Sequence, residues 1–181
     1  MIRSKGSSRE IPIKTVKIKG IYKNPWLSLE EHQVITPDNK KGVYGVLDYG
    51  DGVSVLATDA DDIFLIKEYK YAIKKFSFLL PSGSVNKNET PLKSAKKELL
   101  KEAGLKAGNW ALLGITHPFP TNITTTVYLY LARDAKQIQK PEAGVSLYKF
   151  SISKVKRMID QNKITHSGSL VCLLRYFYGK K

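Results

Sequence analysis

The sequence predicts an α+β fold in which helices cover a mixed sheet and an antiparallel β-region comes first. Three observations support this prediction: short β-type runs separated by turn residues, one strongly capped helical pattern after them, and two helical patterns at the end of the chain. An apolar fraction of 42% in 181 residues is ordinary for a globular protein with one main core. We therefore expect an N-terminal β-region over residues 1–40 and one larger domain over residues 41–181.

The first part of the chain consists of β-type runs, at 11–20, 29–36, 42–50, 53–59 and 62–73. The intervening segments TPDNKKG, YGDG and DADD supply the Asn, Asp and Gly residues that favour tight turns. Because these connections are short, we expect the strands to be largely antiparallel.

A helix is predicted between Thr90 and Gly104. Thr90 suits the N-cap, Pro91 suits the first helical position, and Gly104 is typical of a helix end. Four apolar residues at helical spacing form one stripe, which must face the core. They are Leu92, Ala95, Leu99 and Ala103.

The rest of the chain alternates between strand and helix patterns. Strands are expected at 110–117, 124–132 and 146–151, and helices at 153–162 and 169–179. Cys172 lies in the last helix, and its apolar neighbours predict that it is buried.

Composition narrows the class of partner. A net charge of +14 favours phosphorylated small molecules, nucleic acid or an acidic surface. The lysines are spread along the chain without a dense block or stacking aromatics, so a lysine-rich solvated surface is the alternative to a specific partner, and nucleic-acid binding is not favoured. With no apolar run of about 20 residues, no secretory signal and one cysteine, we expect a cytoplasmic protein without a membrane span or disulfide.

The stretch GSVNKNETPLKSAKKELLKEAGL, from Gly83 to Leu105, carries the candidate chemistry. Glu98 and Glu102 are one helical turn apart at the edge of the apolar stripe, where two carboxylates repel unless a cation lies between them. A hard oxygen-seeking ion such as Mg²⁺ or Mn²⁺ fits that role. Glu89, in the loop before the helix, can fold back towards the same point. The alternative is an exposed helix in which Glu98 pairs with Lys101, Glu102 pairs with Lys106, and nothing is bound.

This stretch resembles the signature box of the Nudix hydrolase family, G-x5-E-x7-R-E-U-x-E-E-x-G-U, where U is a bulky apolar residue. The matching positions are Gly83, Glu89, Glu98, Leu99, Glu102, Gly104 and Leu105. The resemblance to the ADP-ribose pyrophosphatase and nucleotide-sugar branch runs from about Tyr22 to Phe177. It includes the segments KNPWLSLEEHQVITPD, IFLIKEYKYAI, LLPSGSV, HPFPTN and KVKRMIDQNKITHSGSLVCLL.

The resemblance implies an α/β/α sandwich in residues 41–181 and metal-dependent hydrolysis of a nucleoside diphosphate linked to another group. The implied Mg²⁺ or Mn²⁺ ligands are Glu98, Glu102, Glu89 and the Ser82 carbonyl. The implied substrate-binding residues are Lys70, Trp26, Ser82 and Gly83. A homodimer formed through the N-terminal strands is also implied, with Trp26 as a contact to the base or to the second subunit.

The chain departs from the family pattern at four places. Lys101 stands where the family usually has a glutamate ligand, Lys97 replaces the usual arginine, and Leu79 replaces a glutamate of this branch. The segment HPFPTNITT also lacks the acidic residue often found just after the Pro-containing loop. One interpretation is that Lys101 takes the place of a cation and touches the diphosphate. The other is that the domain binds a nucleotide or a protein partner without turnover.

Glu142 falls near the region where this branch places a mobile-loop catalytic glutamate. It is therefore a candidate general base, with an ordinary loop charge as the alternative. The sequence thus predicts a Nudix pyrophosphatase with catalytic candidates Glu98, Lys101, Glu102 and Glu142.

Overall fold

The computed structural model describes residues 12–179, which form two compact units. The first holds the chain up to Tyr49 together with Phe119–Thr124, and the second holds Gly50–Pro118 and the chain from Thr125 onward. Residues 1–11 of the predicted region 1–40 and residues 180–181 of the predicted region 41–181 lie outside the described residues. Residue 11, the first of the strand-like run at 11–20, is among them. The domain division after residue 40 stays a prediction.

The first unit is an antiparallel sheet of order β1-β2-β3. Its strands are β1 (Lys14–Lys23), β2 (Ser28–Ile35) and β3 (Lys41–Asp48). The β1–β2 turn is closed by Asn24, whose side-chain oxygen accepts hydrogen bonds from the backbone N–H groups of Trp26 and Leu27, both at 2.8 Å. All ten residues of β1 are exposed. The predicted antiparallel β-region is confirmed.

The second unit contains a mixed sheet with the strand order β12-β5-β4-β10-β9, extended by β6 beside β5 and β7 beside β4. Strand β10 runs parallel to β4, and the other pairs are antiparallel. Its strands are β4 (Gly52–Asp59), β5 (Asp62–Lys70), β6 (Lys75–Leu79), β7 (Ser82–Ser84), β9 (Asn109–Thr116), β10 (Val127–Arg133) and β12 (Ser146–Ser151). A separate short pair joins β8 (Leu105–Lys106) to β11 (Lys136–Gln137).

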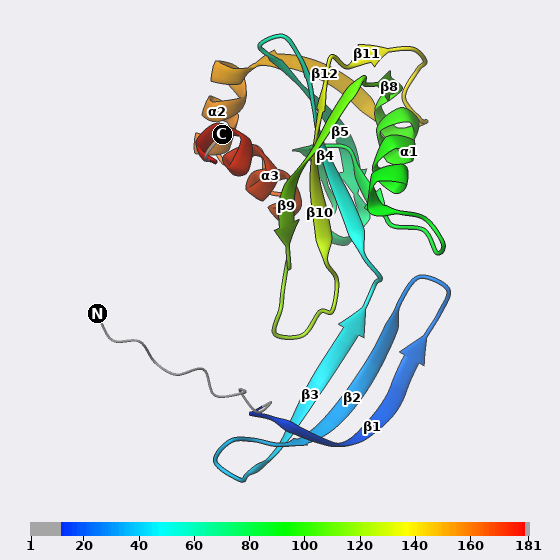
Figure 1. Cartoon of the computed structure of the whole chain (residues 1–181), viewed down its shortest axis with the longest axis vertical. Helices are drawn as coiled ribbons and strands as arrows, with labels where there is room; N and C mark the ends of the chain where they lie inside the picture. The colour runs from blue at the N-terminus through cyan, green and yellow to red at the C-terminus, as the bar shows by residue number, and fades with distance from the viewer. Residues whose placement is uncertain (1–11, 180–181) are drawn as a thin grey trace, which may run out of the picture. The chain divides into compact units, whose positions relative to one another are not determined.

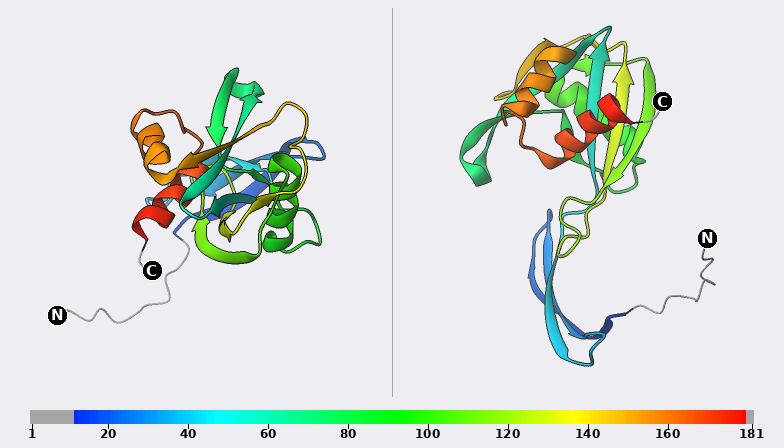
Figure 2. Two further views of the ribbon diagram at one scale, coloured as in Figure 1. Left: turned by 90° about the horizontal axis from the view of Figure 1, so that it is seen from above. Right: turned by 90° about the vertical axis from the view of Figure 1, so that its left-hand side faces the viewer.

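Helices cover both faces of this mixed sheet, as Figures 1 and 2 show. Helix α1 (Pro91–Ala103) packs on one face, and α2 (Ile152–Asp160) and α3 (Ser167–Tyr178) pack on the other. Two separate clusters of buried apolar side chains lie on the two faces, one under α1 and one under α2 and α3. The predicted α/β/α sandwich is therefore confirmed. Cys172 is buried in the second cluster, as predicted.

Helix α1 begins and ends where the sequence predicts. The Thr90 hydroxyl accepts a hydrogen bond from the Lys93 N–H at 3.3 Å, and Gly104 adopts a left-handed φ of 67° at the C-cap. Within the apolar stripe, Ala95, Leu99 and Ala103 are fully buried and Leu92 is partly buried. These contacts fix the rotation of α1 and therefore the direction of every polar side chain on it.

Several details differ from the sequence-based prediction. The strand-like run at 62–73 ends at Lys70, because a 3₁₀ turn over Tyr71–Ile73 and a left-handed Lys74 (φ 52°) reverse the chain into β6. Strands β6, β7, β8 and β11 were not predicted, and the last three have only two or three residues, too few to show a period. Within residues 12–179, no helix combines the length and apolarity needed to cross a membrane.

Candidate functional site

Helix α1 directs Glu98 and Glu102 towards the backbone of β7. The Ser82 N–H donates a hydrogen bond of 2.7 Å to Glu102 Oε2. Glu98 lies against Gly83 so closely that a Cβ at that glycine would be 2.4 Å from the Glu98 carboxyl carbon. Glu98, Glu102 and Ser82, three of the four residues that the sequence predicts as ligands, thus meet at the Ser82–Gly83 backbone, and a side chain at Gly83 would displace the Glu98 carboxylate from its present position.

Glu102 is a buried carboxyl group, with 7% of its surface exposed. Burial raises its pKa to about 7, and the negative charges of Glu68 and Glu98 add to this effect. The Ser82 N–H and the Lys70 ammonium act in the opposite direction. The predicted alternative of an exposed helix is therefore wrong for Glu102, which is buried and accepts from Ser82.

Lys101 lies between two carboxylates. Its Nζ is 3.3 Å from Glu98 Oε2 and 3.8 Å from Glu142 Oε2. Burial alone would lower the pKa of the Lys101 ammonium, but Glu98, Glu142 and Glu102 together raise it above its ordinary value. The Glu98–Lys101 ion pair expected for an exposed helix does form, and Glu142 contacts the same ammonium.

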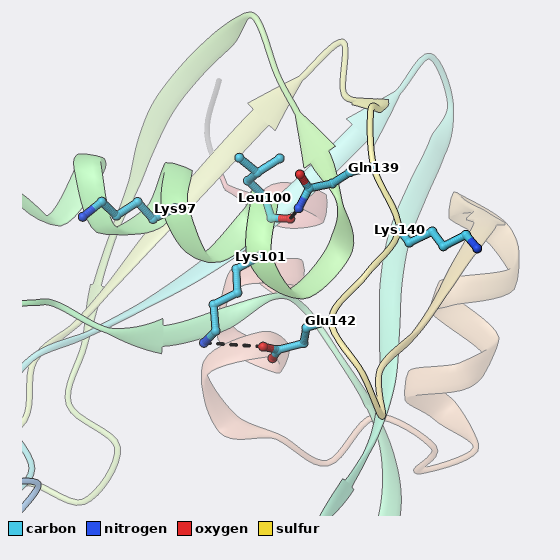
Figure 3. A pocket seen from close by; sticks show the side chains of 6 residues that line it. All are labelled: Lys97, Leu100, Lys101, Gln139, Lys140 and Glu142. Atoms are coloured by element: carbon cyan, nitrogen blue, oxygen red, sulfur yellow. Dashed lines mark hydrogen bonds and ion pairs between the residues drawn. The ribbon is translucent and has the colours of Figure 1, made fainter.

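A pocket of about 340 Å³ opens beside the Lys101–Glu142 pair (Figure 3). Lys97 and Lys140 lie at its edges and point away from that pair. The full lining is Lys97, Leu100, Lys101, Gln139, Lys140 and Glu142. This pocket places open space next to the catalytic candidates Lys101 and Glu142.

Glu89 lies near the N-terminal end of α1 and has its own partners. Lys97 forms an ion pair with one oxygen, and Ser94 Oγ and Asn86 Nδ2 donate to the other at 3.1 and 3.2 Å. The bond from Lys97 lowers the pKa of Glu89 to about 2. Lys97 thus reaches a single carboxylate, as expected of a point ammonium in place of a forked guanidinium.

Lys70 ends β5 and forms an ion pair with Glu68, two residues earlier on the same strand face. Glu68 is 17% exposed. Lys70 was among the predicted site residues and Glu68 was not, although the alternation Ile66, Glu68, Lys70 predicts that both lie on the face that α1 covers. Leu79 is fully buried opposite Ile66 and contributes no charge.

His166 and Trp26 lie outside this group of carboxylates. His166 Nδ1 and Ser169 Oγ are 2.8 Å apart at the start of α3, where the imidazole caps the helix. Burial lowers the pKa of His166, and the positive charge of Lys70 adds to this effect. Trp26 belongs to the first unit and is 78% exposed.

The side chains alone do not form a dense metal centre. Among residues 12–179, no group of three or more His, Cys, Asp or Glu side chains is close enough to hold a metal ion. A metal at Glu98 and Glu102 would need backbone or water oxygens as further ligands.

Comparison with known proteins identifies the family. Residues 48–166, about two thirds of the chain, match the NUDIX domain. Residues 13–47 match the nucleoside diphosphate sugar hydrolase N-terminal domain.

Three curated relatives are each 23% identical to this chain. One is an ADP-ribose pyrophosphatase from Mycobacterium tuberculosis, aligned over 91% of this chain and 83% of its own length. A second is a methanol dehydrogenase activator from Bacillus methanolicus, aligned over 88% of this chain and 90% of its own length. The third is an ADP-ribose pyrophosphatase from Bacillus subtilis, aligned over 70% of this chain and 69% of its own length.

The fold is also that of a solved structure described as an ADP compounds hydrolase. The TM-score is 0.83 at 13% identity, with 94% of this chain and 95% of that chain covered. At this identity the likeness concerns the fold alone. The match over residues 48–166 shows that the chain belongs to the Nudix family. Together with the curated relatives, it identifies the chain as a hydrolase of the pyrophosphatase type.

Proposed function

We propose that the protein hydrolyses the diphosphate of a nucleoside diphosphate linked to another group, and that Mg²⁺ or Mn²⁺ is required. The observation that carries this proposal is the meeting of Glu98 and Glu102 at the Ser82–Gly83 backbone. Two carboxylates at one point, one of them buried, leave a negative charge that a bound cation would offset.

The proposed metal ligands are Glu98, Glu102 and the carbonyl of Ser82, with Glu89 as a further candidate. The residues present fit a hard cation, because all of these donors are oxygens and the pKa of about 7 at Glu102 shows that its charge is poorly compensated. When bound, such an ion would neutralise phosphate oxygens and activate water.

The chain's own residues have separate roles in this proposal. The Ser82 N–H orients Glu102, and the missing side chain of Gly83 lets Glu98 approach. Lys70, on the face of β5 that α1 covers, is proposed to bind a phosphate oxygen. Glu142 is proposed to accept a proton from the attacking water.

The proposed substrate is of the ADP-ribose or nucleotide-sugar type. Two of the curated relatives are named ADP-ribose pyrophosphatase, and the N-terminal match is to a nucleoside diphosphate sugar hydrolase domain. The net charge of +14 suits an anionic substrate of this kind.

We further propose a homodimer formed through the N-terminal strands. The fully exposed strand β1 and the 78% exposed Trp26 provide apolar surface for a second copy or for a base. Size-exclusion chromatography with light scattering tests the dimer, and a monomer at micromolar concentration would contradict it.

The hydrolysis proposal is tested with a substrate panel and purified protein. ADP-ribose, nucleotide sugars, dinucleoside polyphosphates, NADH and nucleoside triphosphates are incubated with Mg²⁺ or Mn²⁺, and nucleoside monophosphate release is measured. We expect turnover of ADP-ribose or a nucleotide sugar that stops with chelator and returns when metal is restored. Turnover that persists in chelator would refute the metal requirement.

A second candidate function is nucleotide binding without turnover. The observation that favours it is Lys101, which brings a positive charge within 3.3 Å of the Glu98 carboxylate. Nucleotide binding by calorimetry, together with the absence of hydrolysis for every panel member, would establish this second function instead.

A further inference from the structure

Lys101 links two parts of the chain that are far apart in sequence. Its ammonium is 3.3 Å from Glu98 on α1. It is also 3.8 Å from Glu142, in the segment between β11 and β12, and Figure 3 shows this second pair. The Glu98 side chain is only 12% exposed. The Lys101 side chain is 57% exposed, so this ion pair is shielded from water on the carboxylate side only.

The segment that carries Glu142 is fastened to the end of α1 by its backbone. The Gly104 carbonyl accepts from the N–H groups of Ile138 and Gln139 at 2.9 and 3.3 Å. The Gln139 side chain donates to the Leu100 carbonyl at 3.1 Å, and the Glu142 N–H donates to the Lys101 carbonyl at 3.1 Å. The position of Glu142 beside Lys101 is therefore built into the backbone.

The balance of carboxylate and ammonium charges around Lys101 indicates how many divalent cations the site can take. Four carboxylates act on this region, and they are those of Glu68, Glu98, Glu102 and Glu142. Two ammonium groups, Lys70 and Lys101, accompany them. When all four acids are ionised, two negative charges remain, and one divalent cation neutralises them. With a glutamate at position 101, four negative charges would remain, enough for two divalent cations.

We propose that Lys101 is a built-in cation, which bridges Glu98 and Glu142 in place of one divalent metal ion. This inference rests on the proposed metal-dependent function and specifies the number of ions. The site then takes one fewer divalent ion than it would with a glutamate at position 101. Glu89 does not alter this balance, since Lys97 is paired with it at the other end of the helix.

The test counts bound ions in the purified full chain. Mn²⁺ binding at neutral pH is measured by equilibrium dialysis, and electron paramagnetic resonance reports whether two bound ions are close to each other. The variants are Lys101→Glu and Lys140→Glu. The second is a matched control, because Lys140 lines the same pocket and gives the same charge change but points away from Glu142.

We expect the unchanged protein to bind one Mn²⁺ at this site. Lys101→Glu should bind one more, with a spin-coupled signal, and Lys140→Glu should behave like the unchanged protein. Equal ion numbers in the unchanged protein and Lys101→Glu would overturn the inference. An equal gain in Lys140→Glu would also overturn it, since the effect would then be one of general charge.

A third variant keeps the test decisive if Lys101→Glu does not fold. Lys101→Gln removes the ammonium without adding a ligand, so Mn²⁺ should bind at the same number but about tenfold or more tightly, as expected when a like charge a few ångströms away is removed. An unchanged Mn²⁺ affinity in Lys101→Gln would count against Lys101 as a cation.

The outcome is separable from that of the proposed function. If the unchanged protein bound no Mn²⁺ and hydrolysed nothing, the proposed function would fail. The comparison with Lys101→Glu would still decide the present inference, because a gain of one ion supports it and no gain overturns it.

Discussion

Glu102 gives the sharpest prediction, because its ionisation should weaken the fold when no metal is present. In the folded protein its pKa is raised to about 7 from an ordinary 4.5. Between these values the folded chain holds a proton that the unfolded chain has released, so stability falls as pH rises through this window. Such a shift corresponds to about 3 kcal/mol at pH 8.

Replacing the carboxyl by an amide removes this loss. Glu102→Gln keeps an oxygen that can accept from the Ser82 N–H, so at pH 8 in chelator its free energy of unfolding should exceed that of the unchanged protein by up to about 3 kcal/mol. Near pH 4.5 the two proteins should differ little. The assay is urea unfolding at both pH values, followed by circular dichroism.

Glu89→Gln is the matched control with the opposite sign. The pKa of Glu89 is lowered to about 2, so its charge stabilises the fold above pH 4.5, and this stability is lost as pH falls towards 2. Glu89→Gln should therefore be less stable than the unchanged protein at pH 8. A Glu102→Gln protein that is destabilised at pH 8, or that shows the same difference at both pH values, would refute the reasoning about burial.

Two further predictions concern glycines. Gly83→Ala should weaken Mn²⁺ binding, measured by calorimetry, by about tenfold or more, because the added Cβ would lie 2.4 Å from the Glu98 carboxyl carbon. Gly108→Ala is the control, since a Cβ there would have nothing within 4 Å. Equal Mn²⁺ affinities in the two variants would contradict the close approach of Glu98 to Gly83. Gly104→Ala should lower the free energy of unfolding by about 2 kcal/mol or more in urea, since φ is +67° and the added Cβ would meet the Gln139 carbonyl at 2.1 Å. A change below about 0.5 kcal/mol would show that the αL cap and this contact are not needed.

Local signals explain why α1 could be predicted so closely. Thr90 has a hydroxyl that accepts a hydrogen bond at an N-cap, and Gly104 tolerates the positive φ of a helix end. The spacing of Glu98 and Glu102 likewise placed both on one helical face. These features depend on neighbours within a few residues, so the sequence reveals them directly.

Contacts between distant segments were harder to predict. The bond from the Ser82 N–H to Glu102 and the pair between Lys101 and Glu142 exist only because the sheet brings β7 and the 138–142 segment to α1. The proximity of Glu68 was missed for a different reason. Glu68 matches no family motif, and only the strand alternation that it shares with Lys70 indicates that it lies on the same face.

Glu98 and Glu102 are proposed to form the metal-dependent hydrolytic site. The most direct test compares the rate of nucleoside monophosphate release from ADP-ribose at saturating Mn²⁺ for the unchanged protein, Glu98→Gln and Asp160→Asn, with Asp160 at the exposed end of α2 as the control. We expect Glu98→Gln to lose at least about 100-fold in kcat with its circular dichroism spectrum unchanged, while Asp160→Asn keeps full activity. A folded Glu98→Gln enzyme with an unchanged rate would contradict the proposed role of Glu98.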